Sequence, residues 1–393
     1  MVILFITSSF LHETYGGVQY YVLELSHWLN KKNIDVIIIT NSINSVVKKI
    51  TLKRMNNEIE LKKGDNNIFK YVPSFLRSFI YAFMSFIEII NSNKKISISI
   101  LHAQDVFISG LIGMMVKKLL KIPLVIHAHG PSPYFYTTTK ETTKIQRIFA
   151  KFLVKIVVNN SNILIATDPH TKNFYVPFIN KSKIVCIPTP INIKSYYKKR
   201  NILYKKILNE NLILGFIGRL SPQKNLQRLL VAFNSVIKTI NRQMKLFIIG
   251  DGPERNILID KVKMLNLKND IIFTGNINEE KKIELLDYFD IFIMPSLYEG
   301  CPVALLEAMA FGKAIIASNI PSIKEIVTNN KEAILIDPHN IEELKKAILF
   351  LSYNSDIRKK LGLKAKKRVK YYDIERINYK VVKIYKNIIS KMV

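Results

Sequence analysis

The sequence predicts an α/β protein built from two doubly wound, Rossmann-like domains. Short apolar runs alternate with longer stretches of helical periodicity, which is typical of parallel strands joined by crossover helices. This alternation occurs twice, and a segment rich in Pro and Lys at residues 188–200 separates the two sets. A chain of 393 residues is long enough for two domains that each bury a core.

Each predicted domain contains six strand-like runs. The first set covers residues 2–7, 34–40, 96–102, 124–127, 163–166 and 184–187, and the second covers 212–217, 246–249, 271–273, 291–294, 314–317 and 333–336. We therefore place the domains at residues 1–190 and 191–372. Ligands of such sheets bind beyond the carboxyl ends of the strands. The site is thus expected in a cleft across which the two domains face each other.

The composition is that of a globular, strongly basic protein. Hydrophobic residues make up 48% of the chain and its formal net charge is +29. Nucleic acid, an anionic membrane surface and phosphate-bearing substrates would each match this charge. No apolar run reaches the ~18 residues of a spanning helix, and residues 1–6 look like a strand rather than a signal peptide. Two cysteines fit a reducing cytoplasm.

One stretch combines an anion site with two carboxylates. The apolar run 290–294 predicts a strand, Gly300 and Pro302 a turn, and residues 303–311 a helix. A helix that begins after such a turn presents unpaired N–H groups to a phosphate. Glu299 and Glu307 flank this site and are suited to accept hydrogen bonds from sugar hydroxyls. Taken alone, Glu299 could be a helix cap and Glu307 a solvated residue.

A second candidate anion site follows the strand at 212–217. Arg219 supplies a planar fork of donors and Lys224 a mobile point charge, so both could turn toward one phosphate. With 59 Lys and Arg residues, however, a basic pair in a loop is also expected by chance. The turns at Gly16–Gly17 and at Gly252 follow strands as well, and spacing alone does not distinguish them from ordinary tight turns.

Two histidines end the predicted strand at 124–127. His127 and His129 could form a metal pair, act as proton-transfer or hydrogen-bonding groups, or be structural imidazoles. Metal binding is the weakest of these interpretations, because no third ligand clusters nearby in the sequence. Thr167 and Asp168 follow the strand at 163–166 and could line the same cleft.

These motifs together resemble glycosyltransferase family 4, whose members are retaining enzymes of the GT-B fold that use nucleotide-diphosphate sugars. The segment from Glu299 to Glu307 resembles the family's E-x7-E motif, and the segment from Gly218 to Asn225 resembles its G-R-x-x-x-x-K-[GN] motif. The resemblance implies that Glu299 holds the donor sugar and Glu307 the ribose.

The resemblance also assigns the remaining site residues. Arg219 and Lys224 would neutralise the leaving diphosphate, His129 would face the transferring sugar, and the segment at 373–393 would return to the first domain. Other donor-binding positions implied by the family are Gly16, Gly17, Gly218, Gly252, Asn276, Ile277, Gly300, Cys301, Pro302 and Val303.

Two basic, apolar segments of the first half suggest a surface for lipid. Lys140, Lys144, Arg147, Lys151 and Lys155 recur at helical spacing, and residues 75–83 are rich in Phe. One interpretation is a solvated helix whose apolar side, including Ile148, Phe149 and Phe152, faces the core. The other is a basic amphipathic helix on anionic lipid.

We therefore expect a retaining glycosyltransferase that needs no metal, since the sequence contains no Asp-x-Asp. Its partners would be a nucleotide-diphosphate sugar, a lipid-linked or glycan acceptor and the inner face of the cytoplasmic membrane, in cell-envelope polysaccharide synthesis. The alternatives are another GT-B enzyme, such as a sugar-nucleotide epimerase, and a nucleic-acid-binding protein. No recognised nucleic-acid motif supports the latter.

Overall fold

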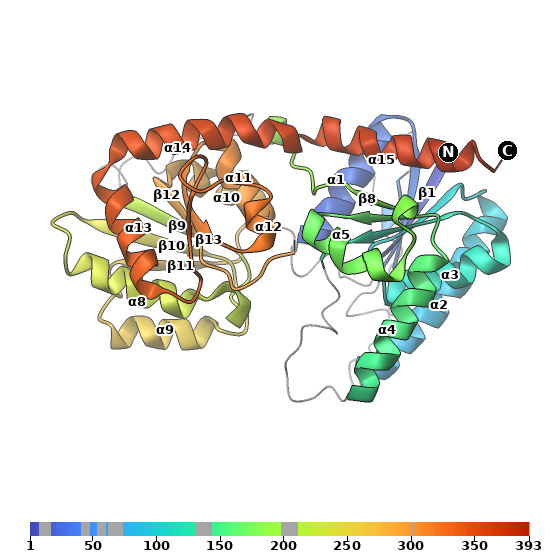
Figure 1. Cartoon of the computed structure of the whole chain (residues 1–393), viewed down its shortest axis with the longest axis horizontal. Coiled ribbons are helices and arrows are strands. Elements are labelled where there is room, and N and C mark those ends of the chain that lie inside the picture. The colour runs from blue at the N-terminus through green and yellow to red at the C-terminus, as the bar shows by residue number, and fades with distance from the viewer. Residues whose placement is uncertain are drawn as a thin grey trace. The chain divides into compact units, whose positions relative to one another are not determined.

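The chain folds into two compact units, shown in the computed structural model of Figure 1. Unit 1 comprises Met1–Pro190 with Glu375–Val393, and unit 2 comprises Ile191–Ile374. The structure describes residues 1–7, 17–40, 48–52, 60–61, 74–130, 144–197, 211–300 and 302–392. Each unit contains a mostly parallel sheet with helices packed on it, so the predicted α/β class with two Rossmann-like domains is confirmed.

Unit 1 is organised around a sheet whose described strands run in the order β4-β3-β2-β1-β5-β6-β7-β8. Their bounds are β1 (Val2–Thr7), β2 (Asp35–Thr40), β3 (Lys48–Leu52), β4 (Glu60–Leu61), β5 (Ile100–Ala103), β6 (Leu124–Ala128), β7 (Ile163–Ala166) and β8 (Ile184–Cys186). The strands pair in parallel except β3, which is antiparallel to β2 and β4. The sequence analysis missed β3 and β4 because these short strands lack an uninterrupted apolar run.

The helices of unit 1 follow the predicted alternation. Described helical segments are α1 (Gly17–Lys31), α2 (Ser74–Lys95), α3 (Ile108–Leu120), α4 (Lys144–Asn159), α5 (Pro169–Tyr175), η3 (Val176–Phe178), η4 (Lys181–Lys183) and α15 (Ile374–Ile389). The C-terminal helix α15 returns to unit 1, as predicted, and its Tyr385 hydroxyl lies 2.6 Å from Nδ1 of His102 in β5. The strand predicted at 96–102 was wrong at its start, because the chain is helical to Lys95 and β5 begins at Ile100.

Unit 2 contains a parallel sheet in the order β11-β10-β9-β12-β13-β14 among its described residues. The strands are β9 (Leu212–Ile217), β10 (Met244–Ile249), β11 (Ile271–Gly275), β12 (Ile291–Met294), β13 (Ala314–Ser318) and β14 (Ile334–Ile336). Renumbered within the unit, this order is 3-2-1-4-5-6, the order of dinucleotide-binding sheets. The chain therefore reverses its direction of winding between β9 and β12.

The helices of unit 2 connect these strands and flank the sheet. They are α6 (Ile193–Tyr197), η5 (Pro222–Lys224), α8 (Leu226–Ile237), α9 (Arg255–Met264), α10 (Glu279–Tyr288), α11 (Val303–Ala310), α12 (Pro321–Lys324), α13 (Ile341–Tyr353), α14 (Ser355–Arg368) and η6 (Val369–Tyr372). All six residues of β9 are buried, as expected for a central strand covered on both faces.

Helix α4 differs from the simplest expectation for an amphipathic helix. Its core-facing residues are small or β-branched, namely Ala150, Val154, Val157 and Val158. Ile148, Phe149 and Phe152 are 60–65% exposed, so the interpretation that buries them in the core is wrong. Among the described residues, no helix combines the length and the apolar character that crossing a bilayer requires.

The centre of the unit 2 sheet is packed so closely that one position excludes any side chain. A Cβ atom placed on Gly215 in β9 would lie 1.9 Å from Cε2 of Phe289, which follows α10. Phe289 is itself 2% exposed and packs among other core side chains, so its ring has no free space to enter. The absence of a side chain at Gly215 therefore allows the Phe289 ring to cover the strand.

We predict that Gly215→Ala destabilises unit 2 by about 1–3 kcal/mol, because an overpacked core must shift to admit the methyl group. Chemical denaturation followed by circular dichroism measures this free energy of unfolding. Phe289→Leu in the Gly215→Ala background should recover part of the loss by vacating the overlapping volume. A Gly215→Ala variant as stable as the wild type would contradict the prediction.

Candidate functional site

The candidate donor site lies at the carboxyl ends of β9 and β12, where the winding of the unit 2 sheet reverses. These strands are neighbours in the sheet. After β9 the chain continues to β10 on one side of β9, and after β12 it continues to β13 on the opposite side. Such a reversal opens a crevice beyond the strands in which nucleotides bind. The loop after β9 carries Arg219 and Lys224, and the loop after β12 carries Glu299 and Gly300.

A buried ion pair joins the two loops. Nζ of Lys224 lies 2.7 Å from Oε1 of Glu299, and their side chains are 15% and 4% exposed. The hydroxyl of Ser296 donates a second hydrogen bond of 2.6 Å to the same oxygen. Carboxylates buried to this degree require such partners, because desolvation of an unpaired charge is costly. The structure thus brings together the Lys and the Glu of the two sequence motifs.

The turn that presents Lys224 is itself fixed to the loop after β12. Backbone N–H of Leu297 donates to the carbonyl of Gln223 at 2.8 Å, and the amide of Asn225 donates to the carbonyl of Pro295 at 3.1 Å. Asn225 adopts a left-handed conformation (φ 58°), which ends η5 and starts α8. These bonds hold the ion pair on rigid backbone, as a binding site requires.

Arg219 is the cation in these loops that remains without a partner among the described residues. Its side chain is exposed, and no described group makes an ion pair or hydrogen bond with its guanidinium. Because guanidinium presents a planar fork of donors, Arg219 is suited to bind an incoming diphosphate.

The turn after β10 lies directly against the Arg219 loop. A Cβ on Gly250 (φ 126°) would lie 2.1 Å from the carbonyl oxygen of Gly218, and one on Gly252 would lie 2.3 Å from that of Leu220. Only glycine permits this approach, which the hydrogen bond from Leu220 N–H to the Asp251 carbonyl (2.9 Å) maintains. The loops that carry the predicted donor residues Gly218 and Gly252 are therefore in direct contact.

The remaining predicted residues of unit 2 occupy several neighbouring elements. Pro302 is buried directly before α11, and Val303 is its first residue. Asn276 is exposed and Ile277 is half-buried in the segment after β11. Cys301 lies outside the described residues.

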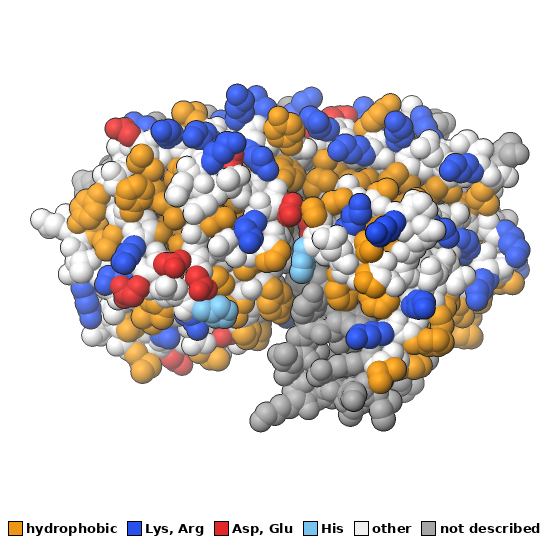
Figure 2. Space-filling view, viewed as in Figure 1, with side chains coloured by type: hydrophobic (Ala, Val, Ile, Leu, Met, Phe, Trp, Pro, Cys, Tyr) orange, Lys and Arg blue, Asp and Glu red, His pale blue; other side chains and the backbone are white. Residues whose placement is uncertain are grey.

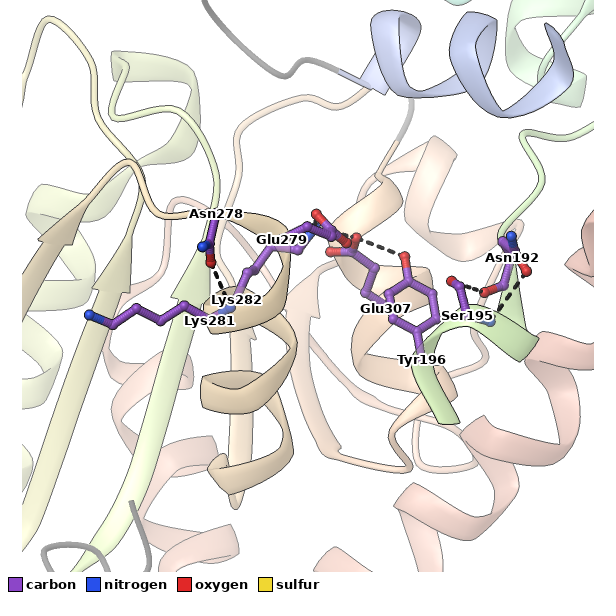
Figure 3. Close-up of polar contacts among 8 residues, drawn as sticks. All are labelled: Asn192, Ser195, Tyr196, Asn278, Glu279, Lys281, Lys282 and Glu307. Carbon is purple, nitrogen blue, oxygen red and sulfur yellow. Dashed lines mark hydrogen bonds and ion pairs between the residues drawn. The ribbon is translucent and has the colours of Figure 1, made fainter. Parts of the chain in front are cut away.

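Glu307 is buried in α11 (2% exposed) and forms a second carboxylate cluster, drawn in Figure 3. Its Oε1 atom accepts hydrogen bonds from Nζ of Lys282 at 2.7 Å and from the Tyr196 hydroxyl at 3.1 Å. The possibility that Glu307 is an ordinary solvated residue is therefore wrong. Sequence reasoning missed Lys282 and Tyr196, because neither belongs to a motif and each lies on a different element from Glu307.

In unit 1, the imidazole rings of His102, His127 and His129 form a column of three nearly parallel rings, with His129 at one end. The rings of His127 and His129 stack at a centroid distance of 4.3 Å with 8° between their planes, and His102 stacks on His127 at 5.6 Å and 10°. His129 Nε2 lies 2.9 Å from Oε1 of Gln104, which follows β5. No described residue hydrogen-bonds either nitrogen of His127. Among the described residues, no three His, Cys, Asp or Glu side chains form a metal cluster.

Burial keeps this column neutral. Desolvation lowers the pKa of His102 and of His129 to about 3, and it lowers the pKa of His127 well below its ordinary value, with the neighbouring imidazoles adding to the effect for His102 and His127. A neutral His129 can accept a hydrogen bond from a hydroxyl group or donate one to it, depending on its tautomer.

The other predicted residues of unit 1 have less distinctive surroundings. Gly17 is the first residue of α1, and Gly16 lies outside the described residues. Asp168 caps α5, where its carboxylate accepts from the Thr171 N–H at 2.8 Å and from the Thr167 hydroxyl at 3.0 Å. These bonds give Thr167 and Asp168 a local structural role.

Comparison with known proteins agrees with this architecture. Residues 15–195 match the family described as Glycosyltransferase Family 4, and residues 199–368 match Glycosyl transferases group 1. An uncharacterized glycosyltransferase of Methanocaldococcus jannaschii is 27% identical over 396 residues, covering 96% of this chain and 95% of the relative. The Escherichia coli UDP-Gal:alpha-D-GlcNAc-diphosphoundecaprenol alpha-1,3-galactosyltransferase is 28% identical over 291 residues, covering 71% of this chain and 73% of the enzyme.

The similarity extends to solved structures. The sucrose-phosphate synthase of Thermosynechococcus elongatus superposes with a TM-score of 0.83 and 18% identity over 99% of both chains. Two Rossmann-like units with these loops define a glycosyltransferase of the GT-B class. The chain belongs to glycosyltransferase family 4, with a group 1 second half.

The buried histidines make the stability of unit 1 depend on pH. An unfolded chain protonates its histidines near pH 6.5, whereas the folded column stays neutral down to about pH 3. The unfolded state therefore binds more protons below pH 6.5, and the free energy of unfolding falls as pH falls, by about 1.4 kcal/mol per pH unit for each such histidine.

We predict that His127→Phe reduces this slope between pH 6.5 and 5, since the ring that it introduces stacks but does not titrate. Urea denaturation at several pH values measures the slope. His27→Gln, on the exposed side of α1, is the matched control and should leave the slope unchanged. Equal slopes for His127→Phe and the wild type would refute the prediction.

Proposed function

We propose that this glycosyltransferase moves a sugar from a nucleotide-diphosphate sugar to an acceptor hydroxyl with retention of the anomeric configuration. The observation that carries the proposal is the buried Lys224–Glu299 pair at the sheet reversal of unit 2, together with Arg219, whose guanidinium has no partner among the described residues. Retention is supported by the family to which the chain belongs, and the use of a UDP-sugar by the name of the Escherichia coli relative.

The proposed chemistry is electrostatic. Negative charge grows on the leaving diphosphate as the bond to the sugar breaks, and Arg219 and Lys224 lower the barrier by stabilising that charge. Glu299 orients the sugar by accepting hydrogen bonds from its hydroxyls, and the family resemblance gives His129 a contact with the transferring sugar. We propose that these cations act without a metal ion, so activity should persist in EDTA.

The acceptor is proposed to be a lipid-linked or glycan intermediate of the cell envelope. Support comes from the diphosphoundecaprenol substrate named for the Escherichia coli relative and from a surface on unit 1 suited to lipid. Helix α3 packs against both α2 and α4. Large apolar side chains of these three helices are exposed, namely Phe83, Met84, Ile87, Met115, Leu119, Ile148, Phe149 and Phe152. We call this set the α2–α4 surface.

Charge on the α2–α4 surface favours an anionic membrane as its partner. Exposed Lys118, Lys151 and Lys155 lie among the apolar side chains, and Figure 2 shows hydrophobic and basic groups side by side in this part of unit 1. Aromatic side chains enter the lipid interface while neighbouring lysines contact anionic headgroups. We propose that the protein binds the inner face of the cytoplasmic membrane through this surface.

We predict that Lys224→Ala and Glu299→Gln each lower kcat by about a hundredfold or more, because each removes a group that acts on developing charge or holds the sugar. Release of UDP from UDP-glucose, UDP-galactose and UDP-N-acetylglucosamine, with a polyprenyl-diphosphate-linked acceptor, measures the rate. Lys263→Ala, a half-exposed lysine on α9, is the control. Full activity of either variant would remove that residue from the mechanism, and turnover without acceptor to an isomeric donor would indicate an epimerase.

We predict that Phe149→Ser/Phe152→Ser weakens binding to vesicles containing anionic phosphatidylglycerol by about tenfold or more, since each Phe loses its burial in lipid. Co-sedimentation with vesicles with and without the anionic lipid measures the partition. Phe350→Ser, an exposed Phe on α13, is the matched control. Unchanged partition of the double variant, or binding to duplex DNA in place of vesicles, would contradict the membrane proposal.

A further inference from the structure

Glu307 is held by two side chains from outside its own helix. Lys282 comes from α10 and Tyr196 from α6, and both converge on Oε1 of the carboxylate (Figure 3). Tyr196 and Glu307 are each 2% exposed, and the Lys282 side chain is 17% exposed. Three separate elements of unit 2 therefore meet at one carboxylate oxygen.

The partners of Glu307 are themselves fixed. Nζ of Lys282 also lies 2.8 Å from Oε2 of Glu279, at the start of α10. Asn278 caps that helix by accepting from the Lys281 N–H at 2.9 Å, while the Lys281 side chain extends away from the cluster (Figure 3). In α6, the Ser195 hydroxyl donates to the Asn192 carbonyl at 2.7 Å, which orders the turn that carries Tyr196.

Lys282 supplies a permanent positive charge. Burial alone would lower its pKa, but the nearby carboxylates of Glu307 and Glu279 outweigh burial and raise the pKa above its ordinary value. The lysine therefore remains cationic over the whole accessible pH range. A buried carboxylate with such a partner stays in place more firmly than one held by neutral donors.

The partners of Glu307 bind only one of its two carboxylate oxygens. Lys282 and Tyr196 both bind Oε1, and Oε2 of Glu307 has no hydrogen-bond partner among the described residues. An oxygen left in this way can accept hydrogen bonds from a ligand without losing its structural contacts. The resemblance of residues 299–307 to the family's E-x7-E motif implies that this carboxylate meets the ribose of the donor.

We propose that Tyr196 and Lys282 are positioning residues, which bind Oε1 of Glu307 so that Oε2 recognises the ribose hydroxyls of the nucleotide. The inference rests on the proposed function. Neither residue touches the substrate, so their loss affects ribose recognition through Glu307. The discrimination between ribose and deoxyribose is consequently the property to measure.

The experiment compares the Kd of UDP, GDP and ADP with those of their 2′,3′-dideoxy forms by isothermal titration calorimetry. We expect the wild type to bind at least one ribonucleotide about tenfold or more tighter than its dideoxy form, because hydrogen bonds to a charged acceptor are lost. Lys282→Met should abolish most of this ratio and Tyr196→Phe part of it, with donor KM changed more than kcat. Lys281→Met and Tyr353→Phe, both exposed, are the matched controls.

The outcomes separate the two levels of the proposal. A wild type that binds no nucleoside diphosphate overturns the proposed function and this inference with it. If the wild type discriminates ribose and Glu307→Gln does not, while Tyr196→Phe and Lys282→Met both discriminate fully, only the inference fails. The inference is also overturned if the wild type binds each nucleoside diphosphate and its dideoxy form with equal Kd. If Lys282→Met does not fold, Tyr196→Phe alone decides, because it removes a single hydroxyl and keeps the ring that packs on Phe311.

Discussion

The reversal of winding at β9 is the constraint on which the donor site depends. Because β9 pairs in parallel with both β10 and β12, the loops after these strands leave the same edge of the sheet and then diverge. The Lys224–Glu299 ion pair joins two of those loops directly. The third loop, which follows β10, contacts the loop after β9 through the close approach of Gly250 to Gly218. Binding groups therefore rest on strands that are fully buried, as in β9 and β12, or largely buried, as in β10, and their geometry follows from the packing of the sheet.

Much of this architecture could be predicted from the sequence. Apolar runs that alternate with helical periodicity indicated both sheets, because strands covered on two faces must be apolar throughout. The site motifs could be recognised through their resemblance to a known family, since the residues alone left ordinary turns and chance basic pairs as alternatives. Arg219, Lys224 and Glu299 are described in loops that follow strands, as expected from these patterns.

Other features lay beyond the reach of sequence patterns for physical reasons. Strand β3 begins with two lysines and has only three residues after them, so its apolar run is too short to give a signal. The sequence left helix α4 open between a core helix and a lipid-binding one, and only the structure shows that small or β-branched residues fill its buried side while Ile148, Phe149 and Phe152 face outward. Tyr196 and Lys282 are 111 and 25 positions from Glu307, and only the fold brings them to it. The His column likewise requires the register of β5 and β6.

The charges of the donor site differ from those of the rest of the chain. Lys224 and Lys282, the two lysines at the site carboxylates, are paired with Glu299 and Glu307, while Arg219 is free among the described residues. A net charge of +29 therefore exceeds what recognition of one diphosphate requires. Basic groups lie over the face shown in Figure 2, including the apolar helices of unit 1. Since an anionic membrane attracts such a surface without sequence-specific contacts, the excess charge is consistent with the membrane contact that we propose and is not needed for the proposed chemistry.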